Sequence, residues 1–162
     1  MTLRRVFALL ATLLTLVVVA QFFLAASGAF DAAPTDTAFE PHRVLGYGIG
    51  LFAILLTIFA ALARMPGPIV RMSGLVAGLV VVQSLIRRIA DAVNGSGDAT
   101  TTAGKLVFGL HAVNGLIILM AAVNIARQAR ALSRSKAAGH PADVDDGTGA
   151  SGPAAGSVQP RS

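Results

Sequence analysis

The sequence predicts an all-α protein: a transmembrane four-helix bundle, N-in/C-in, with a disordered C-terminal tail. Only 13% of its 162 residues are charged, whereas soluble domains carry roughly 25%, and 54% are hydrophobic. The charges are also unevenly placed. Four stretches contain none: residues 6–30, 44–63, 72–86 and 106–126. A helix needs roughly 20 apolar residues to cross a bilayer core about 30 Å thick, and three of these stretches reach that length.

Each stretch predicts one helix of a single transmembrane domain that covers residues 1–136. The expected helices span about residues 5–28, 40–63, 69–93 and 104–126. The first apolar stretch is longer than the about 7–15 residues of a secretory signal peptide, so a retained helix is favoured over a cleaved leader. The third is short, and we expect Arg71 to snorkel at one end of its helix. Residues 137–162 are mostly Ala, Gly, Pro, Ser and Asp, which predicts a disordered cytoplasmic tail.

The basic residues favour a cytoplasmic location for both ends, because cytoplasmic loops are enriched in Lys and Arg. With the N-terminus inside, the inner side holds Arg4, Arg5, Arg64, Arg71, Arg127, Arg130, Arg134 and Lys136. The outer side then holds Arg43, Arg87, Arg88 and Lys105. The net charge of +5 is therefore explained by membrane topology. No nucleic acid is expected as a partner, because the basic residues flank apolar spans without aromatic interleaving.

Absent residue types exclude several kinds of chemistry. The chain has no cysteine, so it has no disulfide framework and no Cys-ligated metal centre. We expect no catalytic residues, because no nucleophile lies beside a base and the acids lie in loops, in the tail or at span ends.

Two histidines lie in matching contexts within the predicted spans. His42 and Gly46 begin the second span, and His111 and Gly115 lie early in the fourth. Residues four apart share a helix face, so each histidine has a side-chain-free patch one turn away. This pattern suits a porphyrin, with His42 and His111 as metal ligands and the two glycines beneath the ring. Haem b is therefore the candidate cofactor.

Three basic residues on the outer side are candidate partners for haem propionates, because guanidinium groups bind carboxylates in a two-pronged geometry. They are Arg43, Arg87 and Arg88. In the alternative interpretation, Arg87 and Arg88 mark the membrane boundary and pair with Asp91. The i, i+3 spacing of Arg88 and Asp91 favours this pairing, because residues three apart are neighbours on a helix. A short similarity between residues 17–21 and 80–83 also suggests an internal duplication, which the sequence leaves open.

The residues Glu40-Pro41-His42-Arg43, Gln83 and His111 together resemble one four-helix half of haem A synthase, in which histidines of the second and fourth helices ligate haem. The region Gln21-Phe22-Phe23-Leu24 and the two His-x-x-x-Gly helices resemble more closely an uncharacterised family of small four-helix bacterial integral membrane proteins. This resemblance implies a multi-pass protein of the bacterial cell membrane. Two hypotheses stay open: a bis-histidine haem b bundle with a membrane redox or assembly partner, and a cofactor-free accessory or interaction subunit.

Overall fold

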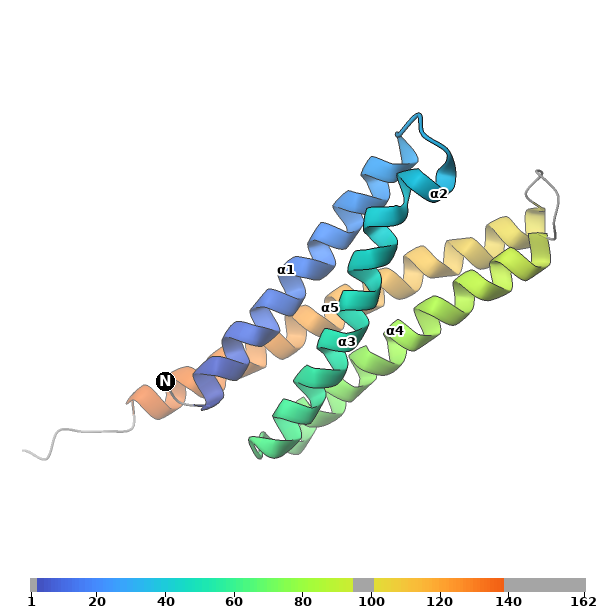
Figure 1. Ribbon diagram of the computed structural model, residues 1–162. Coiled ribbons are helices and arrows are strands. Elements are labelled where there is room, and N and C mark those ends of the chain that lie inside the picture. Colours follow the sequence, from blue (N-terminus) through green and yellow to red (C-terminus); the bar gives the residue numbers. More distant parts are fainter. Residues whose placement is uncertain (1–2, 95–100, 139–162) are drawn as a thin grey trace, which may run out of the picture.

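A computed structural model describes residues 3–94 and 101–138, and the described chain is almost entirely helical (Figure 1). The helices are α1 (Leu3–Ala29), α2 (Thr35–Ala38), α3 (Glu40–Leu62), α4 (Gly67–Asn94) and α5 (Thr102–Ala138). All of them except the one-turn α2 are long and apolar enough to cross a membrane. The predicted fold class is therefore confirmed: the chain is an all-α, multi-pass membrane bundle.

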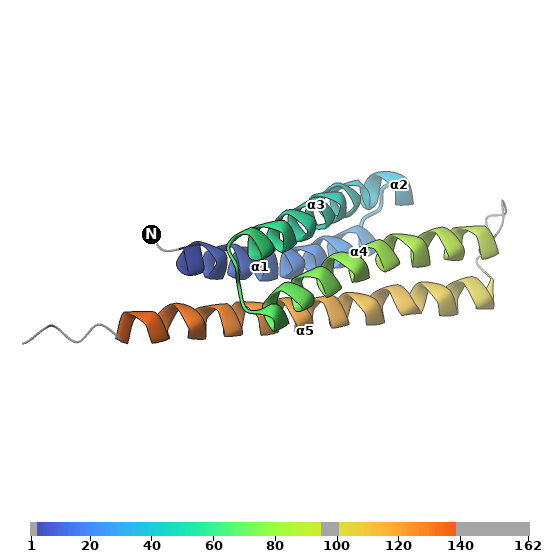
Figure 2. The ribbon, with the colours of Figure 1, turned by 90° about the horizontal axis from the view of Figure 1, so that it is seen from below.

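The four long helices form a ring in which each helix contacts two neighbours. Helix α1 packs against α3 and α5, and α4 packs against the same two helices. The pairs α1/α4 and α3/α5 therefore lie on the diagonals of the bundle. Figure 2 shows the resulting two layers, with the α1–α3 hairpin over the α4–α5 hairpin. The start of α1 and the end of α5 lie at the same end of the molecule, as an N-in/C-in topology requires.

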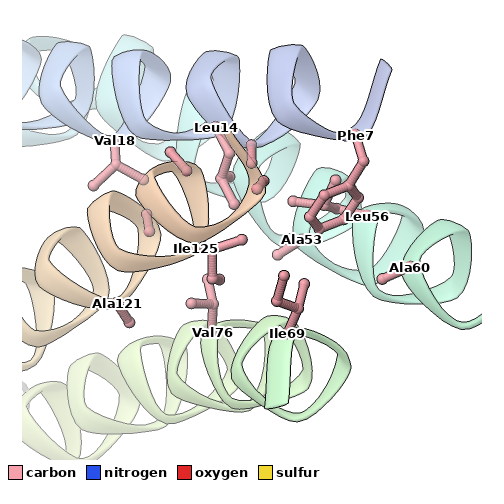
Figure 3. Close-up of a cluster of buried hydrophobic side chains, with 14 of the residues drawn as sticks. Phe7, Leu14, Val18, Ala53, Leu56, Ala60, Ile69, Val76, Ala121 and Ile125 are labelled. Atoms are coloured by element: carbon pink, nitrogen blue, oxygen red, sulfur yellow. The ribbon is translucent and has the colours of Figure 1, made fainter. Parts of the chain in front are cut away.

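The packing inside the bundle depends on small residues. Eight alanines of α1, α3 and α5 belong to the buried core cluster: Ala8, Ala11, Ala53, Ala60, Ala121, Ala122, Ala126 and Ala129. Larger side chains such as Phe7, Leu14, Leu56 and Ile125 fill the spaces that remain (Figure 3). Many other leucines and valines point outward. Small residues inside and large apolar residues outside are expected where lipid covers the outer surface, because helix association in a membrane depends on close packing.

The two hairpins are repeats of one structural unit. A constant shift of 69 residues relates α3 to α5, and a shift of 62 relates α1 to α4. The matched buried pairs are Ile49/Ile118, Ala53/Ala122, Leu56/Ile125, Ala60/Ala129, Phe7/Ile69, Ala11/Ser73 and Leu14/Val76. Because burial repeats at these seven pairs of equivalent positions, the structure supports the duplication that the sequence left open.

The last helix is longer than predicted. Helix α5 continues to Ala138, whereas hydropathy placed its end near residue 126. The extra residues include Ala, Arg, Gln and Leu, which favour helix in water as well as in lipid, and Ala129 is buried against the rest of the bundle. The helix therefore includes the first two residues that were assigned to the tail, 137 and 138. From residue 139 onward, the predicted tail lies outside the described residues.

Candidate functional site

The bundle brings the two predicted histidines together from opposite corners. His42 lies in the first turn of α3, whose N-terminus carries Pro41, and His111 lies further into α5. These helices lie on a diagonal of the bundle. The two ring centroids are nevertheless 6.2 Å apart, and the ring planes are tilted by 49°. We call this end of the molecule the histidine end. The opposite end, where Arg5 and Arg130 lie, is the basic end.

A glutamine from the preceding helix holds each histidine backbone. Gln21 Nε2 donates a hydrogen bond of 2.8 Å to the carbonyl oxygen of His42. Gln83 Nε2 donates one of 2.8 Å to the carbonyl oxygen of His111. A helical carbonyl accepts this second bond because its oxygen has two lone pairs. We call each arrangement a glutamine clasp, and the internal repeat places one in each hairpin.

The glycines after the histidines make room for these neighbours. A Cβ at Gly46 would lie 3.1 Å from Gln21 Nε2. At Gly115 it would lie 3.3 Å from Cζ of Phe22 and 3.7 Å from Gln83 Nε2. The sequence predicted an open patch at each glycine for a porphyrin. In the structure, protein side chains lie against both glycines.

The His42 ring is oriented by a further hydrogen bond. Its Nδ1 lies 3.1 Å from the carbonyl oxygen of Gln21. A carbonyl only accepts, so we assign the proton to Nδ1, which leaves the lone pair on Nε2. In the second hairpin, His111 Nδ1 is buried and has no hydrogen-bond partner within the described part of the chain.

The two clasps differ at one position. Asn114 Nδ2 donates to Gln83 Oε1 at 2.5 Å and to the carbonyl oxygen of Leu79 at 2.9 Å. Leu45 occupies the equivalent position in the first hairpin, and it has no donor to offer. Gln21 Oε1 is accordingly buried without a partner among the described residues.

Each histidine also contacts an aromatic ring three residues earlier, which the sequence interpretation missed. Phe39 meets His42 edge-on with centroids 6.1 Å apart, and Phe108 stacks on His111 at 5.4 Å. The repeated motif is therefore Phe-x-x-His-x-Val-x-Gly, from Phe39 to Gly46 and again from Phe108 to Gly115. Extending the alignment of the two histidine segments three residues toward the N-terminus would have revealed it.

Two of the three candidate propionate partners form ion pairs within the protein. Arg43 Nη1 lies 3.3 Å from Asp36 Oδ1, and its other amino group donates to the Asp36 carbonyl oxygen. Arg87 Nε lies 3.6 Å from Asp91 Oδ2. Asp91 thus pairs with Arg87 four residues away, as the alternative interpretation expected, whereas its Arg88–Asp91 pair is not formed among the described residues. Arg88 is exposed on the outside of α4.

The two histidines alone do not make a conventional protein metal site. Among the described residues, no group of three or more His, Cys, Asp or Glu side chains is placed to hold a metal ion. Zinc sites normally use at least three protein ligands. A metal ion between His42 and His111 would therefore need ligands other than these two side chains.

Comparison with known proteins gives one match. Residues 21–90 are similar to a family of unknown function, DUF6220. The matched region begins at Gln21 of the first glutamine clasp, ends within α4 and includes His42, Gly46 and Gln83. No curated protein and no solved structure is significantly similar to the chain. The match agrees with the expected resemblance to an uncharacterised family, and none of the comparisons supports a resemblance to haem A synthase.

Proposed function

We propose that this protein is a haem b-binding membrane bundle in which His42 and His111 would both ligate the iron of one haem. The observation that carries the proposal is the 6.2 Å between the two ring centroids. Two imidazoles on one metal ion have centroids about 6 Å apart, because each metal–nitrogen bond is about 2 Å and each nitrogen lies about 1 Å from its ring centroid. Rotation about a metal–nitrogen bond leaves this distance unchanged, so the 49° tilt is compatible with ligation.

The same spacing is less suitable for a direct hydrogen bond. Ring nitrogens facing each other at this centroid distance are about 4 Å apart, beyond the roughly 3 Å of a hydrogen bond. A metal ion between the two nitrogens would match this distance, because it lies about 2 Å from each. His42 is further prepared for ligation, because its Nδ1 is held by the Gln21 carbonyl. Metal-bound histidines commonly make this outer hydrogen bond, which fixes the ring and its tautomer.

Haem would supply the further iron ligands that the protein lacks, together with one-electron redox chemistry. His42 and His111 of one chain would be the two protein ligands of its iron. Arg43, Arg87 and Arg88 are the proposed partners of the propionates. In the structure, Arg43 pairs with Asp36 and Arg87 pairs with Asp91. The glycine contacts expected from the sequence form no part of this proposal, because Gln21 and Phe22 lie against Gly46 and Gly115.

The test is a reduced-minus-oxidised visible spectrum of detergent-purified protein from haem-replete cells. We expect haem b bands in the wild type and their loss in His42→Ala and His111→Ala. His140→Ala is the matched control, because this third histidine lies in the predicted tail, and it should keep the bands. Thermal unfolding of each variant checks that the loss of colour is not a loss of fold.

A second candidate is the cofactor-free accessory or interaction subunit, and the two glutamine clasps favour it. Polar side chains that hydrogen-bond between helices commonly hold membrane bundles together, and both histidine carbonyls take part in such bonds. A wild type that is folded, supplied with haem and still colourless would overturn the haem proposal. Replacing Gln83 would then lower stability without any spectral change.

A further inference from the structure

The basic end of the bundle carries a groove between the start of α1 and the extension of α5. Arg5, Ala8, Leu9 and Thr12 line it from α1, and Arg130 and Ser133 line it from α5. Its volume is about 300 Å³. We call it the α1–α5 groove. It exists because α5 continues as a helix beyond the apolar span, which places Arg130 beside the first turns of α1.

The charges around the groove have one sign. Among the described residues, the basic end carries Arg4, Arg5, Arg64, Arg71, Arg127, Arg130 and Arg134 and no Asp or Glu. Both ion pairs in the described part of the chain lie at the histidine end. Arg127, Arg130 and Arg134 follow helical i, i+3, i+7 spacing, so they share one face of α5. The groove is therefore surrounded by positive charge.

The groove has a polar rim and an apolar wall. Arg130 donates from Nε to the carbonyl oxygen of Ala126 at 3.3 Å, and its terminal amino groups have no hydrogen-bond partner among the described residues. Thr12 and Ser133 donate their hydroxyls to backbone carbonyls of their own helices. The two arginines thus remain as the donors for an external ligand. Beneath them, Ala8 and Leu9 present hydrocarbon.

We propose that the α1–α5 groove binds an anionic phospholipid, with its phosphate between Arg5 and Arg130 and its acyl chain along Leu9. Guanidinium groups bind phosphate oxygens in bidentate geometry. Anionic lipids are enriched in the cytoplasmic leaflet, the side on which we expect the basic end to lie. A ligand with a charged head and a hydrocarbon tail matches both parts of the groove, whereas a free anion would leave the apolar wall uncovered. The proposal is independent of haem.

Native mass spectrometry of the full-length detergent-purified protein tests this proposal by titration with phosphatidylglycerol or phosphatidylcholine. We expect phosphatidylglycerol to bind more tightly. Arg5→Gln and Arg130→Gln should each weaken it about fivefold, the equivalent of about 1 kcal/mol for one basic residue near an anionic surface. Arg71→Gln is the matched control, since it removes the same charge at the same end but does not line the groove. Arg130→Lys should retain part of the binding.

Several outcomes would overturn the proposal. Equal binding of phosphatidylglycerol and phosphatidylcholine would show that the groove does not select a negatively charged lipid. If Arg71→Gln weakened phosphatidylglycerol binding as much as the groove variants, the lipid would respond to the overall charge of the basic end and not to a site in the groove. Displacement of phosphatidylglycerol by inorganic phosphate, at matched ionic strength in chloride, would assign the groove to a free anion. The readout is bound lipid mass, so it does not depend on whether the protein carries a cofactor.

Discussion

The two glutamine clasps are alike in geometry and differ in how fully their polar atoms are satisfied. Gln83 donates to the carbonyl oxygen of His111 and accepts from Asn114. Gln21 donates to the carbonyl oxygen of His42, but its Oε1 is buried without a partner among the described residues. A buried unpaired acceptor is costly, so the first clasp stabilises the bundle less than the second.

Replacing the glutamines with leucine tests this difference. Gln83→Leu removes two hydrogen bonds and should lower stability by about 1–2 kcal/mol, since interhelical bonds in membranes contribute about 0.6 kcal/mol on average and up to about 1.7. Gln21→Leu removes one bond and one orphaned oxygen, so its effect should be smaller. Reversible unfolding in mixed detergent, followed by circular dichroism, measures both. An equal loss in the two variants would contradict the assigned network.

Two glycines on α3 provide a second comparison at the residue scale. A Cβ at Gly48 meets nothing within 4 Å, whereas one at Gly46 meets Gln21 Nε2. Gly48→Ala should therefore stabilise the helix by about 0.5–1 kcal/mol, the helix-propensity difference between the residues. Gly46→Ala should show little of this gain, because Gln21 Nε2 must shift from its place beside the His42 carbonyl to make room for the new methyl group. The same unfolding measurement compares the stability of the two variants. An equal gain in stability would contradict the inferred contact between Gly46 and Gln21.

The helices show what hydropathy predicts well and what it does not. The first three spans were placed to within a few residues, because their ends coincide with charged residues, prolines or glycines. The end of α5 was missed by twelve residues, because hydropathy reports where a helix leaves the membrane, whereas propensity and packing decide where it ends. Buried Ala129, beyond the apolar span, shows that the extension belongs to the bundle.

A proline within the extension tests that conclusion. Ala131 is exposed on α5, so its replacement removes little packing. Ala131→Pro should cost about 3 kcal/mol, because proline in a helix interior removes a backbone hydrogen bond and clashes with the preceding turn. It should also weaken lipid binding at the α1–α5 groove. Unchanged thermal stability would indicate that residues 127–138 do not form a packed helix.

At the scale of the whole molecule, the basic end and the histidine end face opposite sides of the membrane. Positive charge predicts that the basic end is cytoplasmic. The absence of cysteine allows a direct test, because single cysteines can be introduced at Thr35 and Ser135. A membrane-impermeant maleimide should label Thr35→Cys in intact cells and Ser135→Cys only after permeabilisation. The reverse pattern would invert the topology.

The repeat explains why the candidate site was only partly predictable from the sequence. His42 and His111 were found because polar residues are rare in apolar spans. Their meeting across a diagonal follows from the ring order of the helices, which no local pattern encodes. The glycines were assigned to a cofactor because a sequence shows an absent side chain but not the neighbour that fills its space. Gln21 and Phe22 fill that space here.

The mole ratio of haem to protein tests the central proposal most directly. Because both proposed ligands come from one chain and their ring centroids lie 6.2 Å apart, purified wild type reconstituted with excess haem should hold one haem per chain. The variant with both His42→Ala and His111→Ala should hold almost none. A wild type that stays free of haem, or a double variant that still binds one haem per chain, would contradict the account.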